Sequence, residues 1–193
     1  MSRSDDLYAL DRLATESTRL RVAALTEADL DRPSTCSGWD VRAVLSHLVG
    51  GNIRFAQALR GEAADWPSRD SEPVTSPLAQ FDTTAAAMTA AIAGIDDPSR
   101  PALLPGGAAP PAAFAVGVHG ADMLVHGWDI AIATGQDPEL DHDLCLLALG
   151  VVAKYPESFW GSGRYFAARL DTDSVDPQDR LLAVTGRDKD VRV

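Results

Sequence analysis

Two histidines and two aspartates recur along one stretch of the chain at spacings of three, four and three residues: His119, Asp122, His126 and Asp129. At about 100° of rotation per residue, these spacings put all four side chains on one stripe of a helix. Most other residues of the stretch are apolar or small, which is typical of a buried helix. Because burying ionisable groups without partners costs free energy, we expect these four to be paired, hydrogen-bonded or bound to a metal ion.

Asp122 and His126 lie one helical turn apart, so they can share a single ion. His119 and Asp122 have a similar spacing, but His119 and His126 are separated by roughly 10.5 Å of helical rise, too far for one small ion. We choose Asp122 with His126 and keep His119 as a candidate for a supporting role. Spacing alone leaves the choice open, because Asp-x-x-x-His pairs are common in helices that bind no metal.

A third ligand has to come from another helix, and His47 is the obvious source. It lies at the edge of an apolar stripe, and Gly50 and Gly51, one turn later, leave space beside the imidazole. Two nitrogens and one carboxylate, with one position left for water or substrate, are typical of a catalytic rather than a structural zinc site. A metal ion in such a site lowers the pKa of a bound water or thiol.

Three further side chains could face a ligand. Arg54 lies two turns beyond His47 and could meet a substrate carboxylate, although the interpretation we favour is a solvated surface arginine. Trp39 and Trp128 could line the mouth of a pocket, and packing in the core is an equal alternative for both.

Asp129 and Cys36 are candidates for supporting roles near the ligands. Asp129 lies one turn after His126 and could orient its imidazole. Cys36 precedes a helix N-terminus, where a thiolate is favoured. We nevertheless interpret Cys36 as a small buried residue, because no histidine lies near it in the sequence.

The elements that must position these residues are helices. Apolar periodicity and end signals predict helices over about residues 5–25, 41–60, 77–93, 112–134 and from 138 onward. Four long helices joined by short-to-moderate loops predict an all-α four-helix bundle, with an additional helix and a short C-terminal extension. We expect residues 1–135 to form the metal-binding bundle and residues 136–193 to pack on it.

Several helix ends have specific signals. Ser37 and Asp40 have the spacing of a capping box before the second helix, as do Thr26 and Asp29 in the turn that precedes it. Asp137 followed by a proline predicts the start of the fifth helix. Near the C-terminus, only residues 180–185 could form a short strand or extended edge.

Three glycines interrupt the 112–134 helix at Gly117, Gly120 and Gly127. Each costs roughly 1 kcal/mol relative to alanine in a helix. We therefore expect another helix to approach closely on the face opposite the polar stripe.

Composition limits the classes of function. The chain has 193 residues, 46% of them hydrophobic, and 17 basic against 28 acidic residues give a net charge of −11. Such a surface repels a phosphate backbone, which argues against nucleic acid as a partner. Two distant cysteines fit a reducing compartment, and neither a signal peptide nor an apolar run of roughly 18 residues is evident. We expect a soluble, cytoplasmic protein that acts on a small molecule and has no membrane partner.

Four segments together resemble a known family: residues 36–42 (CSGWDVR), 45–48 (LSHL), 122–131 (DMLVHGWDIA) and 179–187 (DRLLAVTGR). They are similar to the actinobacterial mycothiol-dependent maleylpyruvate isomerase-like proteins, within the DinB-like (YfiT-like) metal-binding four-helix bundles. The resemblance covers roughly residues 5–135, and the ending resembles a compact, uncharacterised branch.

The resemblance implies a ligand set and a chemistry. In the family, a histidine of the second helix and an acid-x-x-x-His pair of the last bundle helix bind a divalent ion, commonly zinc. These roles fall on His47, Asp122 and His126, with nickel or another ion as an alternative to zinc. The metal would activate mycothiol or a similar low-molecular-weight thiol, whose thiolate attacks an electrophile in an isomerisation or S-transfer. Related bundles often form dimers.

The chain departs from the isomerase in two respects. Asp122 stands where the isomerase has a glutamate, and the C-terminal part is shorter than the isomerase's second domain. The hypothesis is therefore a metal-dependent thiol transferase or isomerase whose substrate is unassigned. The alternatives are a non-catalytic metal-binding or regulatory bundle and a metal-dependent hydrolase with the same ligands.

Overall fold

The computed structural model describes residues 3–66, 73–161, 166–191 and 193, and within these ranges the regular elements are helices without strands. The bundle consists of α1 (Arg3–Ala23), α2 (Val41–Arg60), α3 (Pro77–Ala93) and α4 (Ala112–Thr134). Two shorter helices follow, α5 (His142–Val152) and α6 (Pro177–Val184). The all-α bundle is therefore confirmed. No helix in the described part of the chain has the length and apolarity needed to cross a membrane.

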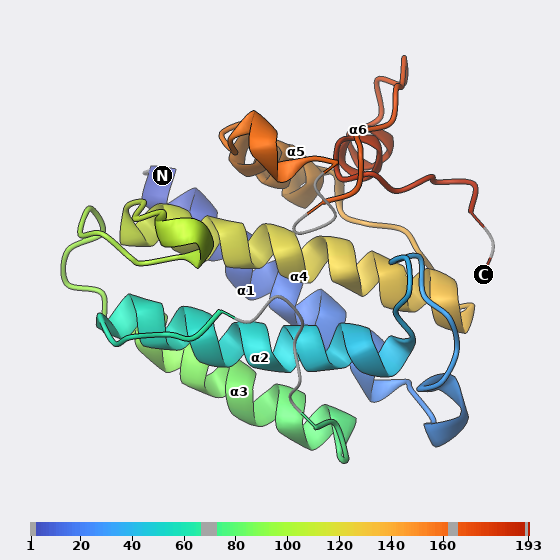
Figure 1. Ribbon diagram of the computed structural model, residues 1–193, viewed down its shortest axis with the longest axis horizontal. Coiled ribbons are helices and arrows are strands. Elements are labelled where there is room, and N and C mark those ends of the chain that lie inside the picture. Colours follow the sequence, from blue (N-terminus) through green and yellow to red (C-terminus); the bar gives the residue numbers. More distant parts are fainter. Residues whose placement is uncertain (1–2, 67–72, 162–165, 192) are drawn as a thin grey trace.

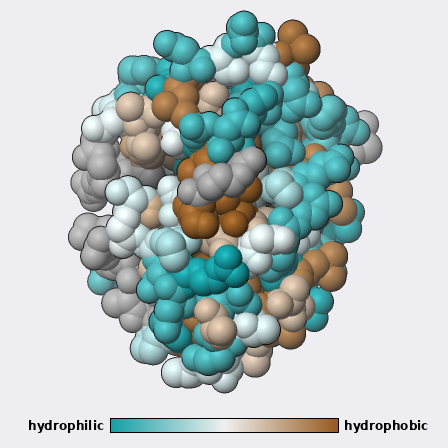
Figure 2. Space-filling view, turned by 90° about the vertical axis from the view of Figure 1, so that its right-hand side faces the viewer, coloured by the Kyte–Doolittle hydropathy of each residue, from teal (hydrophilic) through white to brown (hydrophobic). Residues whose placement is uncertain are grey.

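The four long helices pack side by side, and α5 and α6 lie together on one side of α4 (Figure 1). The pair α1 and α4 has the most extensive contact, α2 packs on both α3 and α4, and α5 packs on α4, α1 and α6. Leu45, Leu124 and Trp128 are among the fully buried side chains of the core, which also includes Leu144 and Val151 of α5. The end of the molecule that faces right in Figure 1 is largely hydrophilic, with a hydrophobic patch near the middle of the face (Figure 2).

Most predicted helix ends are confirmed, and the exceptions have local causes. At α2 the carboxylate of Asp40 itself accepts a hydrogen bond from Ala43 N, so Asp40 is the cap and the predicted capping box with Ser37 is wrong. At α5 the helix begins four residues later than predicted, because Asp141, rather than Asp137, caps it through Leu144 N.

The predicted strand or extended edge at residues 180–185 is also wrong, since most of this segment belongs to α6. Asp176 caps the helix by accepting from the amides of Gln178 and Asp179, and Pro177 occupies the first helical position. A cap followed by proline is a helix-start signal, and it outweighs the short apolar run that suggested a strand.

The glycines of α4 allow α1 to approach closely, as predicted. A Cβ atom on Gly120 would lie 2.7 Å from Asp11 Cα, and one on Gly127 would collide with the Thr18 side chain. The Thr18 hydroxyl donates to Met123 O at 2.7 Å, which joins the two helices at the same level. The backbone contact at Gly120 holds α4 against α1 and so fixes the position of its polar residues.

We predict that Gly120→Ala lowers the free energy of unfolding by about 1–3 kcal/mol, because the added methyl group must displace the α1 backbone. Gly150→Ala on α5 is the matched control, since a Cβ atom added at Gly150 would meet nothing within 4 Å. There the substitution should raise stability by up to about 1 kcal/mol. Urea denaturation measures both, and a Gly120→Ala protein as stable as wild type would contradict the close packing.

Candidate metal centre

The three predicted ligands come from two helices and converge on one point. His47 lies on α2, while Asp122 and His126 lie one turn apart on α4. His47 Nε2 is 3.0 Å from Asp122 Oδ2, and His126 Nε2 is 3.5 Å from Asp122 Oδ1. Their donor atoms all lie within 4.8 Å of one another. Two imidazole nitrogens and a carboxylate are a donor set that suits zinc, so the residues present fit such an ion.

The electrostatics of Asp122 depend on the two histidines. Burial raises the pKa of its carboxyl, but the charges of His47 and His126, with the hydrogen bond from His47, outweigh burial and hold the pKa well below the usual range. Asp122 is therefore ionised at neutral pH. Metal binding needs this carboxylate in its ionised form, together with neutral imidazoles.

His119 is not part of this group, although it shares the stripe with Asp122. Its Nδ1 lies 2.5 Å from Asp11 Oδ1 on α1 and its Nε2 lies 3.0 Å from Asn52 Oδ1 on α2. The Asn52 amide donates to the Thr84 hydroxyl on α3 at 3.1 Å. His119 is thus the centre of a buried hydrogen-bond network that joins all four bundle helices, and both of its nitrogens are already engaged.

Asp129 makes the contact with His126 that was predicted for it. His126 Nδ1 donates to Asp129 Oδ2 at 2.8 Å, which leaves Nε2 facing Asp122. Arg187 donates to the same carboxylate through Nη2 at 2.9 Å and Nε at 3.2 Å, and the Thr35 hydroxyl also bonds to it. Burial raises the pKa of Asp129, but the charge of Arg187 and the bond from His126 outweigh it and keep the carboxyl ionised.

Cys36 is half-buried, in keeping with the packing role that we favoured, but it also lies beside these groups, which its distance in the sequence from any histidine did not indicate. Its Sγ is 3.3 Å from Asp129 Oδ2, 3.4 Å from Arg187 Nη2 and 3.9 Å from His126 Nδ1. Cys36, His126 and Asp129 are therefore close enough to hold a second ion. Arg187 Nη2 lies 2.9 Å from Asp129 Oδ2, so its guanidinium already supplies this second group with the positive charge that an ion would otherwise provide.

A cavity of about 1250 Å³ opens beside the three ligands. Trp39 lies at the ligand end, with its ring 5.4 Å from that of His47 and 6.2 Å from that of His126. The rest of the wall is rich in aromatic side chains: Phe55, Trp66, Phe114, Tyr155, Phe159 and Phe166. The site is thus a polar point on the wall of a large, mainly apolar cavity, which is the usual form of a small-molecule site.

The structure decides the roles that the sequence left open for Arg54 and for the two tryptophans, Trp39 and Trp128. Arg54 is 7% exposed and lines the cavity, with its guanidinium 6.0 Å from the Trp66 ring, so the favoured interpretation as a solvated surface arginine is wrong. Of the two tryptophans, Trp39 lines the cavity, whereas Trp128 is 1% exposed and packs in the core.

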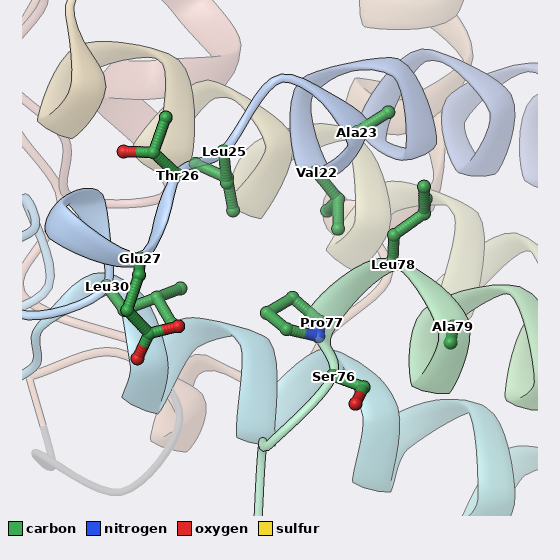
Figure 3. Close-up of a pocket in the computed structure, with 10 residues that line it drawn as sticks. All are labelled: Val22, Ala23, Leu25, Thr26, Glu27, Leu30, Ser76, Pro77, Leu78 and Ala79. Atoms are coloured by element: carbon green, nitrogen blue, oxygen red, sulfur yellow. The ribbon is translucent and has the colours of Figure 1, made fainter.

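A second hollow of about 370 Å³ lies between the end of α1 and the start of α3 (Figure 3). Val22 and Leu25 face into it, and Leu78 also lines it. Among the residues that line it, Glu27 alone is ionisable. The Glu27 carboxylate pairs with Arg42 at 3.3 Å. This hollow therefore lacks the donor groups that distinguish the larger cavity.

The chain is similar to known proteins in both sequence and structure. Residues 12–131 match the family described as the mycothiol maleylpyruvate isomerase N-terminal domain. An uncharacterized protein of Mycobacterium tuberculosis, found in strains CDC 1551 / Oshkosh and H37Rv, is 30% identical over 188 residues, which cover 95% of this chain and 98% of the relative.

Among solved structures, the mycothiol-dependent maleylpyruvate isomerase superposes with a TM-score of 0.62 at 17% identity, and a mutant of it with 0.64 at 16%. Each superposition covers 79% of this chain and 68% of the other. At this identity the likeness shows the fold, and it confirms the DinB-like helical bundle.

We predict that Cys36 reacts slowly with iodoacetamide in the folded protein. Burial, followed by the charge of Asp129, raises the pKa of its thiol to about 12. The thiolate fraction at pH 8 is then lower than that of an ordinary cysteine by roughly three orders of magnitude, and alkylation should slow by a similar factor. Peptide mass spectrometry measures the rate, with the denatured chain as the reference. Equal rates in the folded and denatured chains would contradict the raised pKa of the thiol.

Proposed function

Because the chain belongs to the mycothiol maleylpyruvate isomerase N-terminal domain family, we propose that it is a metal-dependent enzyme that uses mycothiol or a similar small thiol in a transfer or isomerisation. The observation that carries this proposal is the convergence of two imidazoles and one carboxylate on the wall of a cavity of about 1250 Å³. A cavity of this size accommodates both a thiol and a substrate.

His47, Asp122 and His126 would hold the divalent ion, with zinc favoured by the donor types and nickel or another ion as the alternative. Such an ion, when bound, lowers the pKa of a thiol or water that coordinates it. The shorter aspartate side chain at position 122 is compatible with this role, because its two oxygens already reach both imidazoles.

The protein's own residues would bind and orient the reactants. Trp39 and the aromatic wall give the ligand end of the cavity an apolar surface, against which a thiol and a substrate can pack. Burial, followed by the charge of Asp122, raises the pKa of Tyr155, so its hydroxyl stays protonated and can donate a hydrogen bond to a ligand in the cavity. Arg54 supplies a positive charge on the same wall.

The substrate is not carried over from the isomerase. The superposition covers 79% of this chain and 68% of the isomerase, so part of each protein has no superposed counterpart in the other. We therefore propose only the class of reaction, a thiol-dependent transfer or isomerisation, and we do not propose maleylpyruvate as the substrate of this chain.

We also propose that residues 136–193 belong to the same folding unit as the bundle of residues 1–135. Leu140, Leu144 and Val151 are buried in the core that the bundle helices form.

A reducing, cytoplasmic location fits both a thiol cofactor and the two unpaired cysteines, Cys36 and Cys145.

We predict that the wild-type protein binds about one zinc ion per chain after zinc loading. His47→Ala, Asp122→Ala and His126→Ala should each lose most of this metal, because two donors that remain hold zinc weakly. His142→Ala is the matched control, since His142 is exposed and pairs with Asp176. Elemental analysis after desalting measures the content, and a wild-type value below about 0.2 ion per chain would contradict the metal role.

We predict that mycothiol changes the visible absorption spectrum of the cobalt-substituted protein, because a coordinating thiolate alters the ligand field of the ion. The His126→Ala protein, treated in the same way, is the control. An unchanged spectrum at saturating thiol would contradict the thiol role. Turnover of simple esters without any added thiol would instead support the hydrolase alternative, in which a water molecule occupies the open position.

A further inference from the structure

Arg187 reaches the candidate metal centre from the C-terminal end of the chain, outside the residues 12–131 that match the family. It follows α6 directly, where Gly186 adopts a left-handed conformation with φ of 76°. Gly186 N bonds to Ala183 O at 3.0 Å and Arg187 N to Leu182 O at 2.8 Å, which ends the helix with the geometry typical of a C-terminal glycine cap. The end of α6 therefore aims Arg187 at the bundle.

The guanidinium of Arg187 is held firmly in place. Its side chain is 10% exposed, and the Asp129 side chain that it contacts is fully buried. Two N–H groups bond to the two carboxylate oxygens of Asp129, at 2.9 and 3.2 Å, and Nη1 donates to Thr185 O at 2.8 Å. A fork of this kind fixes the plane of the carboxylate as well as its position.

The orientation of Asp129 determines the orientation of His126. Asp129 Oδ2 accepts the Nδ1 proton of His126 at 2.8 Å, so that Nε2 is directed toward Asp122 and His47. Without Arg187, this buried carboxylate would keep an imidazole N–H, a hydroxyl and a thiol as partners, and it would lack a compensating charge. Arg187 provides that charge, and without it Asp129 would turn or take up water, releasing the imidazole.

We propose that Arg187 is a positioning residue for the metal centre, acting through Asp129 to hold the imidazole of His126 in its ligating orientation. The proposal rests on the proposed function in that it takes His126 as a metal ligand. Its consequence is that the C-terminal segment is a required part of the site, and the family-matched residues alone form an incomplete one.

Variants at two positions test this role. Arg187→Ala removes the fork, Arg187→Lys keeps the charge without the paired bonds, and Asp129→Asn removes the charge that Arg187 recognises. Lys189→Ala is the matched control, because Lys189 lies two residues further on and pairs with Asp179 at the surface. Circular dichroism and thermal unfolding establish that each variant is folded before it is compared.

The first measurement is independent of metal. In metal-free protein labelled with ¹⁵N-histidine, the chain's four histidines give few signals, and His126→Ala assigns the one of interest. The Nδ1 proton of His126 should be protected from exchange with water in wild type and Lys189→Ala, and should exchange at least about tenfold faster in Arg187→Ala. Equal protection in Arg187→Ala would overturn the proposal, whether or not the protein binds zinc.

The second measurement is zinc affinity by competition with a chromophoric chelator. Loss of a group that orients a ligating histidine costs about 10–100-fold in affinity. Arg187→Ala and Asp129→Asn should both show this loss, Arg187→Lys should recover part of it, and Lys189→Ala should match wild type. Wild-type affinity in a folded Arg187→Ala protein would overturn the proposal while leaving the three ligands intact. If wild type itself binds no zinc, the proposed function fails, and the exchange measurement still decides the role of Arg187.

Discussion

The carboxylate of Asp122, held between the imidazoles of His47 and His126, is the interaction on which the rest of the arrangement depends. It joins α2 to α4 at 3.0 Å across a space that also opens onto the cavity. Three polar side chains in such a place cost free energy unless they satisfy one another or share an ion. The surrounding structure therefore has to hold two helices at a fixed distance and rotation, and it does so in two ways.

The first support is close backbone packing, and the second is a buried polar network. At Gly120 the backbone of α4 lies against that of α1, so α4 cannot shift without a clash. At the same level of α4, His119 joins Asp11 of α1 to Asn52 of α2, and Asn52 continues to Thr84 of α3. A fully satisfied network of this kind specifies one packing arrangement of the four helices. His119 is engaged in this network, whereas His126 on the same stripe faces Asp122, so the two histidines have different roles.

The sequence predicted the helices well and the site in part. Periodicity and end signals located the four bundle helices, because α-helical periodicity and glycine or proline at helix ends are local properties. Spacing on one helix brought Asp122 and His126 together, whereas the resemblance to the family supplied most of the case for His47. The role of Asp129 was also accessible, since it lies one turn from His126.

The remaining features depend on contacts between distant segments. Arg187 is 58 residues from Asp129 and Cys36 is 93 residues from it, so no local spacing could relate them. The burial of Arg54 depends on the cavity, whose walls come from several elements. The helix at the C-terminus was missed for a different reason, because we based the prediction on the apolar run alone and did not consider Asp176 and Pro177 before it. The features that could not be predicted are thus mainly polar and charged side chains that the tertiary structure brings close to His47, Asp122 and His126.

X-ray absorption spectroscopy of the zinc-loaded protein tests the metal centre most directly. We expect a first shell of nitrogen and oxygen atoms at about 2.0–2.2 Å, with the outer scattering of two imidazole rings. In His47→Ala the imidazole contribution should fall by half. A sulfur neighbour at about 2.3 Å would contradict this ligand set, because it would put the ion at Cys36 rather than between His47, Asp122 and His126.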